Sequence, residues 1–289
     1  MTFMRTPGGL KSLASIHGVD RVFFCEGGSP ATTPNATGAL QGTLDELFWS
    51  NFFAEFGVAE TVRVVSQGSR PAVEKLIDVA ISQKISSIGG CLDRDWTNIK
   101  PKSDSGVIIL TTSGYSWEND CLSTDTIEVA CENFLHPSDD LKSLLKDQIK
   151  NFTEELEYIS EYVELDEILI LNGNTGFFPR DKPLALLEQV GKISICFDRS
   201  KVSGRQATLS VSSQNCVNKN NVDYALKNIY GHTLIRFALH KFGSFIFDHT
   251  SGKLSHDLFM RMLIKNFFPI IRSSNCSLNA HYSACAALF

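Results

Sequence analysis

The sequence predicts an α/β protein in which a parallel sheet flanked by helices occupies residues 1–135 and a mainly helical region follows over residues 136–289. In the first region, short apolar runs alternate with helical patterns between about residues 19 and 134, as parallel βαβ units require. Beyond residue 136, apolar side chains recur at three- and four-residue spacing, which indicates amphipathic helices. We therefore expect two domains, with the boundary between residues 135 and 136.

Four apolar runs are the expected strands of the sheet, at residues 19–26, 61–65, 87–92 and 106–112. Each is short and bounded by turn-forming residues, which is typical of a buried strand. Helical patterns follow at residues 44–56, after Pro71, and at residues 124–134, and a proline this early in a pattern marks a helix start. The polar stretch 97–105 is expected to be a turn-rich connection.

In the second region the longest amphipathic pattern covers residues 140–163. Residues 222–242 and 255–268 also have helical spacing, whereas residues 172–183 and 203–221 are rich in polar and turn-forming residues and are expected to be loops.

Composition argues against a largely disordered chain, a disulfide-rich protein and a membrane-spanning protein. A hydrophobic content of 43% over 289 residues allows a sizeable core, and a formal net charge of −5 gives no overall basic surface for nucleic acid. The eight cysteines are scattered without a CxxC pair, which favours small core side chains over a zinc site or a disulfide framework. No window resembles a signal peptide or a membrane span, so we expect a soluble, cytoplasmic protein.

Acidic residues stand where expected strands end. Glu26 closes the first run, and Asp93 and Asp95 follow the third. Ligands of open α/β sheets collect beyond the carboxyl ends of the strands, so these three side chains are expected to share one sheet edge. Glu118, after the fourth strand, is a further acidic position expected near that edge.

This acid set suggests a magnesium site. Mg²⁺ prefers oxygen ligands, commonly one or two carboxylates completed by water and phosphate, and such sites support phosphoryl transfer. Asp93 and Asp95 could both turn toward one ion, and Glu26 could hold a second ion or act as a general base. Charged residues after a strand are often only a solvated turn, but the combination favours the metal site.

These residues resemble the Toprim fold of topoisomerases, primases, ribonuclease M-five-type maturases and OLD-type nucleases. The resemblance covers about the first half of the chain and depends on strand-Glu26-Gly27-Gly28, strand-Asp93-x-Asp95 and the βα alternation between them. A later Ser-x-Glu-Asn element, which contains Glu118, extends the likeness. The chain departs from the pattern at residues 29–42, an insertion where many Toprim proteins enter a helix quickly.

Within the Toprim group the chain most resembles the AriB effector nucleases of PARIS anti-phage systems, which pair with an ABC-type ATPase, AriA. This resemblance implies a toxic Mg²⁺-dependent endonuclease, with Mn²⁺ as a substitute ion, that its ATPase holds inactive until a phage anti-restriction protein triggers release. The implied substrate is RNA, tRNA in particular, and the implied outcome is abortive infection. Glu26 takes the catalytic role, Glu26, Asp93 and Asp95 bind metal, and Glu118 is an additional metal-binding or structural acid.

Basic side chains could assist substrate binding. Arg70 stands at a helix start suited to a phosphate, Arg94, Lys100 and Lys102 could steer a polyanion toward the metals, and His232 could reach a phosphate from the second region. For each of them an ordinary structural or solubilising role remains open. A homodimer is expected, because a second copy extends the reach over a folded RNA.

Other functions remain open. The chain could be a non-catalytic Toprim-fold subunit that docks on an ATPase, or an OLD-type DNA nuclease. A topoisomerase is disfavoured because no tyrosine stands out for strand cleavage and the chain is short for a gate domain. A primase would be expected to carry a zinc-binding module, and none is apparent.

Overall fold

The computed structural model describes residues 6–28, 42–97, 99–190, 194–212 and 216–289. Two compact units make up the chain: Met1–Ser113 together with Phe267–Phe289, and Gly114–Asn266. The sequence-based division counted residues up to 135 with the first domain, whereas these compact units separate after residue 113, and residues 267–289 return to the first unit.

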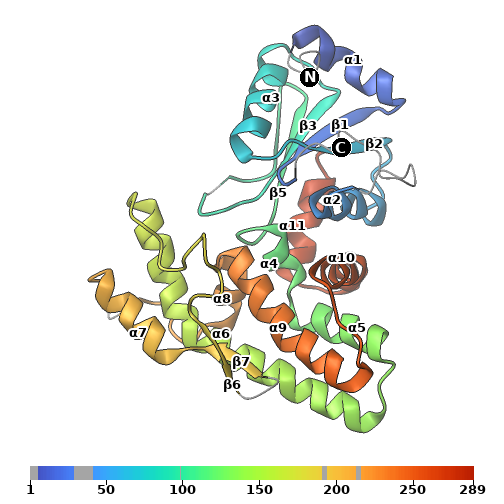
Figure 1. Ribbon diagram of the computed structural model, residues 1–289. Helices are drawn as coiled ribbons and strands as arrows, with labels where there is room; N and C mark the ends of the chain where they lie inside the picture. Colours follow the sequence, from blue (N-terminus) through green and yellow to red (C-terminus); the bar gives the residue numbers. More distant parts are fainter. Residues whose placement is uncertain (1–5, 29–41, 98, 191–193, 213–215) are drawn as a thin grey trace. The chain divides into compact units, whose positions relative to one another are not determined.

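The first unit contains a five-stranded, mostly parallel sheet (Figure 1). Its strands are β1 (Arg21–Cys25), β2 (Val62–Ser66), β3 (Ile88–Leu92), β4 (Lys102–Asp104) and β5 (Val107–Thr111), in the spatial order β2-β1-β3-β5-β4. Strands β1, β2, β3 and β5 are parallel, and β4 pairs antiparallel with β5. The α/β class and the parallel sheet are therefore confirmed.

Helices cover both faces of this sheet. On one face, α1 (Pro7–His17) and α3 (Arg70–Ser82) pack on alternate strand residues such as Val22 and Phe24 (Figure 1). On the other face, Phe23 contacts Phe53 of α2 (Leu44–Glu55) and Phe289, which follows α11 (Ser277–Ala286). An aromatic cluster, which we define as eight buried or partly buried side chains, fills this second face: Phe23, Phe48, Trp49, Phe52, Phe53, Phe268, Tyr282 and Phe289.

Two glycines in β3 allow this close packing. A Cβ on Gly89 would collide with the ring of Phe23, and a Cβ on Gly90 would collide with the side chain of Ile77 from α3. The strand therefore lies against bulky side chains on both faces, which explains an Ile-Gly-Gly-Cys-Leu run in a fully buried position.

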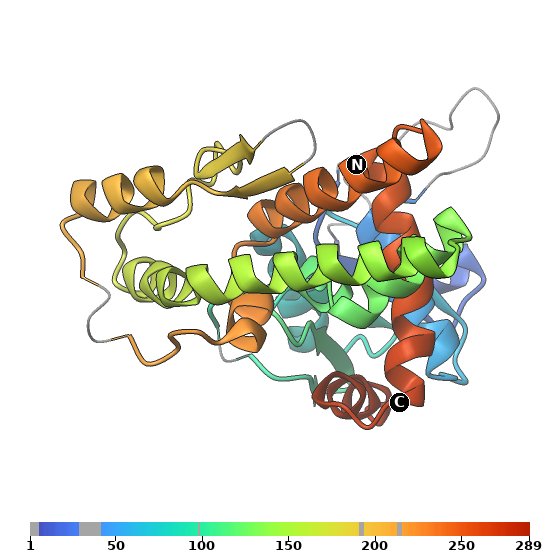
Figure 2. The same cartoon turned by 90° about the horizontal axis from the view of Figure 1, so that it is seen from below.

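The second unit is mainly helical. Its elements are α4 (Trp117–Cys121), α5 (Thr124–Leu135), α6 (Asp139–Leu171), β6 (Leu187–Val190), β7 (Ser194–Phe197), α7 (Arg199–Thr208), α8 (Val222–Asn228) and α9 (Gly231–Thr250), and α10 (His256–Ser273) runs from this unit into the first. The long helix α6 contacts α5, α8 and α9 (Figure 2). Phe152 of α6 stacks on Phe237 of α9, with ring centroids 5.1 Å apart.

The structure corrects several element predictions. The stretch 97–105 contains the short edge strand β4, the expected loop at 203–221 begins inside α7, and the pattern 222–242 is two helices, α8 and α9. Helices α1 and α11 and the β6–β7 hairpin were not predicted, and α6 continues to Leu171. The insertion at residues 29–42 falls almost wholly outside the described residues.

Hydrogen bonds from the side chain of Asn119 mark the break between α8 and α9. The side-chain amide of Asn119 donates to the carbonyl oxygens of Leu226 at 2.7 Å and of Ile229 at 2.8 Å, and Ile229 itself is extended. These carbonyls are the free acceptors at the end of a helix, so a distant side chain completes the C-terminus of α8.

Candidate active site

Glu26 and Asp93 meet at the carboxyl edge of the sheet. Strands β1 and β3 are adjacent and parallel, with Cys25 opposite Cys91, so the residues that follow them leave the sheet side by side. The backbone N–H of Asp93 donates to Oε1 of Glu26 at 3.0 Å. The structure therefore places the Glu26 carboxylate against the backbone of Asp93, 67 residues away in the sequence.

The environment of Glu26 is suited to proton transfer. Burial raises the pKa of its carboxyl group to about 7, and the negative charges of Asp95 and Asp45 act in the same direction. The Asp93 N–H and the Arg70 guanidinium oppose this shift. A general acid or base works best when its pKa lies near the working pH, so Glu26 has the protonation behaviour that the catalytic prediction requires.

Gly27 and Gly28 shape the chain directly after Glu26. Both have positive φ angles, 85° and 60°, which glycine adopts without strain. Gly27 exchanges two backbone hydrogen bonds with Gly68 after β2, at 2.9 and 3.3 Å. A Cβ on Gly27 would collide with the carboxylate of Asp45, so the absence of a side chain here lets that acid approach.

Asp45 is an acid that sequence reasoning missed. It lies in the first turn of α2, whose start is fixed by a capping box between Thr43 and Glu46. Oε1 of Glu46 also accepts from the N–H of Ser66 at the end of β2, at 2.8 Å. The capping pattern of Thr43 and Glu46 is visible in the sequence. The placement of Asp45 beside Glu26, however, depends on the pairing of β1 with β2.

Arg70 binds the loop that carries the two aspartates. Its Nη1 donates to Oδ2 of Asp95 at 2.7 Å and to the carbonyl oxygen of Asp93 at 3.1 Å, while its Nε donates to Oε1 of Glu74 at 2.8 Å. Asp95 has a φ of 50°, an uncommon left-handed conformation for a residue with a side chain. Arg70 is thus part of the acidic edge, and its predicted contact with phosphate stays a prediction.

The loop between the aspartates is held to the next strand. The N–H of Arg94 donates to Oγ1 of Thr112 at 2.8 Å, and the N–H of Thr112 donates to the carbonyl oxygen of Leu92 at 3.1 Å. Thr97 closes the loop by donating twice to the carbonyl oxygen of Arg94, through its N–H and its hydroxyl. These bonds fix the backbone on which Asp93 and Asp95 stand.

Lys100 and Lys102 approach the same edge along the sheet. Both are exposed, and Lys102 begins β4 opposite Ile109 of β5, which itself pairs with Gly90 of β3. Because β4 is antiparallel, the chain before Lys102 continues toward the carboxyl edge. This placement fits a role in attracting a polyanion, which remains a prediction together with that of Arg94.

The donor types at this edge fit a hard cation, because Glu26, Asp93 and Asp95 all supply carboxylate oxygen. Their arrangement is less suited to one: within the described residues, no three His, Cys, Asp or Glu side chains are grouped so that they could hold a metal ion. One reason is that the Asp95 carboxylate is bound to Arg70.

Glu118 belongs to the second unit, where its motif has a structural role. Ser116 and Asn119 form a capping box at α4, and the Ser116 hydroxyl donates to the Asn119 side chain at 2.8 Å. A Cβ on Gly231, the first residue of α9, would lie 3.4 Å from Oε2 of Glu118. The helix dipole of α9 favours a carboxylate at the N-terminus of that helix. Metal binding by Glu118 stays a prediction.

His232 is exposed in the first turn of α9. Its Nδ1 lies 3.2 Å from the hydroxyl of Tyr230, and the guanidinium of Arg180 lies 4.2 Å from the centre of the Tyr230 ring. These contacts fit the structural role that we weighed for His232, and its contact with substrate stays a prediction.

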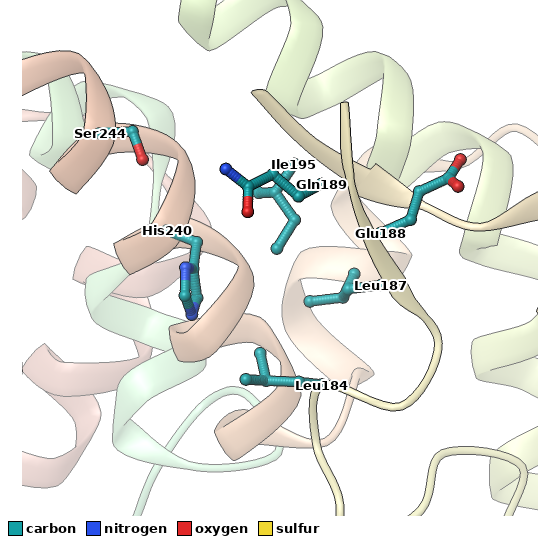
Figure 3. A pocket seen from close by; sticks show the side chains of 7 residues that line it. All are labelled: Leu184, Leu187, Glu188, Gln189, Ile195, His240 and Ser244. Atoms are coloured by element: carbon teal, nitrogen blue, oxygen red, sulfur yellow. The ribbon is translucent and has the colours of Figure 1, made fainter. Parts of the chain in front are cut away.

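A separate pocket of about 230 Å³ lies between the β6–β7 hairpin and α9 (Figure 3). Leu184, Leu187, Gln189, Ile195, His240 and Ser244 line it together with Glu188. Glu188 points away from the others in Figure 3, and its Oε1 accepts from the thiol of Cys196 at 3.6 Å. The pocket is therefore lined mainly by apolar side chains together with Gln189, His240 and Ser244, and it was not anticipated from the sequence.

The chain matches no protein-family model, and no curated protein sequence is significantly similar to it. Among the described residues, no helix has both the length and the apolar character needed to cross a bilayer.

Proposed function

We propose that this protein is a metal-dependent nuclease of the Toprim type, with its active site at the carboxyl edge of β1 and β3. The observation that carries the proposal is the meeting of Glu26 with Asp93, in surroundings that raise the pKa of Glu26 to about 7. The glycine turn after Glu26 and the strand-Asp-x-Asp sequence on the neighbouring strand support the Toprim assignment.

Each group has a distinct task in this proposal. Asp93 and Asp95, with Glu26, would hold Mg²⁺ or Mn²⁺, which when bound neutralises charge on a phosphodiester and makes a nearby water more acidic. Glu26 exchanges a proton with the attacking or the leaving oxygen, for which a pKa near 7 is well matched. Lys100 and Lys102 attract the polyanion toward the edge of the sheet.

The biological setting of the proposal depends on the resemblance to AriB. On that basis the enzyme is a toxic effector of an anti-phage system that cleaves tRNA after release from an ABC-type ATPase, AriA, when a phage anti-restriction protein is sensed. The cytoplasm and a homodimeric state belong to the same proposal.

Cleavage assays with purified protein test the activity. Wild type, Glu26→Gln and a control, Asp78→Asn on the exposed side of α3, are incubated with total cellular RNA and with plasmid DNA, in Mg²⁺ or in EDTA. We expect discrete RNA fragments from wild type and control, lost in EDTA and in Glu26→Gln. Cleavage by Glu26→Gln at the wild-type rate would overturn the catalytic role, and cleavage of plasmid alone would favour a DNA nuclease.

A further inference from the structure

The pocket between the β6–β7 hairpin and α9 has room for one ring system and not for a larger ligand. Its volume of about 230 Å³ is below the roughly 300–1,000 Å³ that is usual for pockets that enclose whole drug-sized molecules. A ligand that enters the pocket with a flat ring would therefore leave its other parts outside, at the surface of α9 and of the hairpin (Figure 3).

The side chains around the pocket suit the ring of a nucleobase. Leu184, Leu187 and Ile195 supply apolar surface, on which the face of such a ring can pack. The amide of Gln189 and the ring of His240 border the same cavity from β6 and α9 (Figure 3). An amide and a neutral imidazole each carry a hydrogen-bond donor and an acceptor, so both can pair with the edge of a base.

A row of basic side chains leads along α9 to this pocket. His232, Arg236 and His240 are exposed and follow one another at four-residue spacing, which places them on one side of the helix with about 6 Å between successive positions. Among the residues that the structure describes, no carboxylate forms an ion pair with the guanidinium of Arg236. The row therefore presents a positive charge one helical turn from the pocket, and the planar guanidinium of arginine is well suited to phosphate.

A second helix adds to the positive side of the site. Burial lowers the pKa of His256, the first residue of α10, and the positive charges of Arg236 and His232 lower it further. These side chains therefore lie close enough to repel one another, and a bound anion would relieve that repulsion. Asp257 opposes the shift, but its carboxylate is bound to Arg261 at 2.8 Å.

Two carboxylates near these residues narrow the position of an anion. Glu118 lies beside the start of α9, so it offsets positive charge at the His232 end of the row. Glu188 borders the pocket, but its side chain points away from the other lining residues in Figure 3. The position best suited to an anion is therefore Arg236, between His232 and the pocket.

We infer that the pocket binds the base of a nucleotide and that Arg236, together with His240, binds its phosphate. The ligand is a nucleoside phosphate, either free or as one residue of a single-stranded RNA, because both join a flat ring to a phosphate through a ribose. Arg236 is one helical turn, about 6 Å, from His240, a step that the ribose can span. All of these residues belong to the second unit, so the site is independent of the acidic edge and of any metal ion.

Binding measured in EDTA, with ligands that lack one part of a nucleotide, tests the site. The full-length protein is titrated by ligand-observed NMR with AMP, CMP, GMP and UMP, with the matching nucleosides, with ribose 5-phosphate and with a single-stranded oligoribonucleotide. The variants are Arg236→Gln, which removes the charge, and Gln189→Leu, which removes the hydrogen bonds to the base and is exposed enough to be tolerated. Lys146→Gln is the matched control, because it removes an exposed positive charge from α6 of the same unit. Thermal unfolding confirms that each variant is folded.

The two variants should affect different ligands. We expect Arg236→Gln to weaken the binding of nucleotides and of ribose 5-phosphate by roughly tenfold, the effect of losing one charge-assisted hydrogen bond, and to leave nucleoside binding unchanged. Gln189→Leu should weaken the binding of nucleotides and nucleosides by about two- to tenfold and leave ribose 5-phosphate unchanged. Lys146→Gln should stay within about twofold of wild type for every ligand.

The oligoribonucleotide distinguishes the two sources of the ligand. Binding roughly tenfold or more tighter than that of the best mononucleotide, with this advantage lost in Arg236→Gln, would identify an RNA strand, and equal affinity would identify a free nucleotide.

Other outcomes would overturn the site. Failure of every nucleotide to bind, or nucleotide binding that neither Arg236→Gln nor Gln189→Leu weakens, would exclude it. Ribose 5-phosphate that binds as tightly as the nucleotides would exclude the base from the pocket, and nucleosides that bind as tightly would exclude the phosphate from Arg236. Glu26→Gln should bind nucleotides like the wild type, so a failure of the proposed nuclease and a failure of this site give different results.

Discussion

The backbone N–H of Asp93 donates to the carboxylate of Glu26 at 3.0 Å across the β1–β3 pair. This bond fixes where the Glu26 side chain lies relative to the Asp-Arg-Asp loop. The bond also favours the ionised form of the Glu26 carboxylate. Burial has the larger effect and raises the pKa of Glu26 to about 7.

Stability of the metal-free protein should depend on pH through Glu26. The folded state raises its pKa from 4.5 to about 7, so the folded protein binds the proton more tightly than the unfolded chain. The stabilisation is fully present below pH 4.5 and is lost as the pH rises through 7. Between pH 5 and pH 8 in EDTA, the wild type should therefore lose on the order of 1–3 kcal/mol of unfolding free energy relative to Glu26→Gln. Urea unfolding at both pH values measures this, and parallel curves for the two proteins would contradict the shift.

Gly89→Ala should destabilise the first unit. The added methyl group would collide with the ring of Phe23, which is itself packed on Phe53 and Phe289. Overpacking a core typically costs about 1–3 kcal/mol, and we expect a loss in that range. Gly8→Ala is the control, since a Cβ at this exposed position of α1 meets nothing within 4 Å. Equal stabilities of the two variants by urea unfolding would refute the close contact between β1 and β3.

Asn119→Asp should destabilise the second unit. The substitution keeps the shape of the side chain but replaces the amide that donates to the carbonyls of Leu226 and Ile229 with an acceptor. One buried and one partly buried carbonyl oxygen then face a carboxylate oxygen, and we expect a loss of about 2–4 kcal/mol. Asn133→Asp provides the comparison, because the Asn133 amide makes one exposed contact with Asn266 and should change stability by less than about 0.5 kcal/mol. If both variants unfold alike, the link from α4 to α8 carries little energy.

Glu118→Gln distinguishes a structural acid from a metal ligand. Removing the charge at the start of α9 should lower the free energy of unfolding by about 0.3–1 kcal/mol, the usual size of an interaction between a side chain and a helix terminus. Glu157→Gln, an exposed position in the middle of α6, should have no such effect. Unchanged stability would contradict the interaction with α9, and a weakened Mn²⁺ affinity in Glu118→Gln would support the predicted metal role.

The sequence predicted the sheet well because its strands carry their own signals. Runs such as Val22-Phe23-Phe24 and Val107-Ile108-Ile109-Leu110 are buried on both faces, so their apolar pattern is continuous and easy to recognise. Strand β4, by contrast, has the sequence Lys-Ser-Asp and exists because the edge of β5 offers backbone partners. Its strand character is imposed by tertiary contacts and is invisible in local propensity.

For the candidate site, the positions of the acidic residues at the sheet edge were easier to predict than the side chains that surround them. Glu26 and Asp93 could be expected to meet because the carboxyl ends of parallel strands share one edge. The Arg70–Asp95 ion pair and the approach of Asp45 to Gly27 depend on how α3 and α2 return to that edge, which periodicity does not specify. The Ser-x-Glu-Asn motif predicted Glu118 as a metal-binding or structural acid, and the sequence did not show that Ser116 and Asn119 form a helix cap and a contact with α8.

The discontinuity of the first unit has a consequence for biosynthesis. The ribosome makes β1 and β3, with their acids, early, and Phe53 with them, but α11 and Phe289, which also contacts Phe23, follow only after residues 114–266 have been made. Until then one face of the sheet lacks part of its packing, and contacts this distant in sequence form slowly. A nascent chain would thus carry the acids on an incompletely packed scaffold, and a mature acidic edge would arise only late in synthesis. For an enzyme proposed to attack the RNA of its own cell, that order delays activity until residues 267–289 have been made.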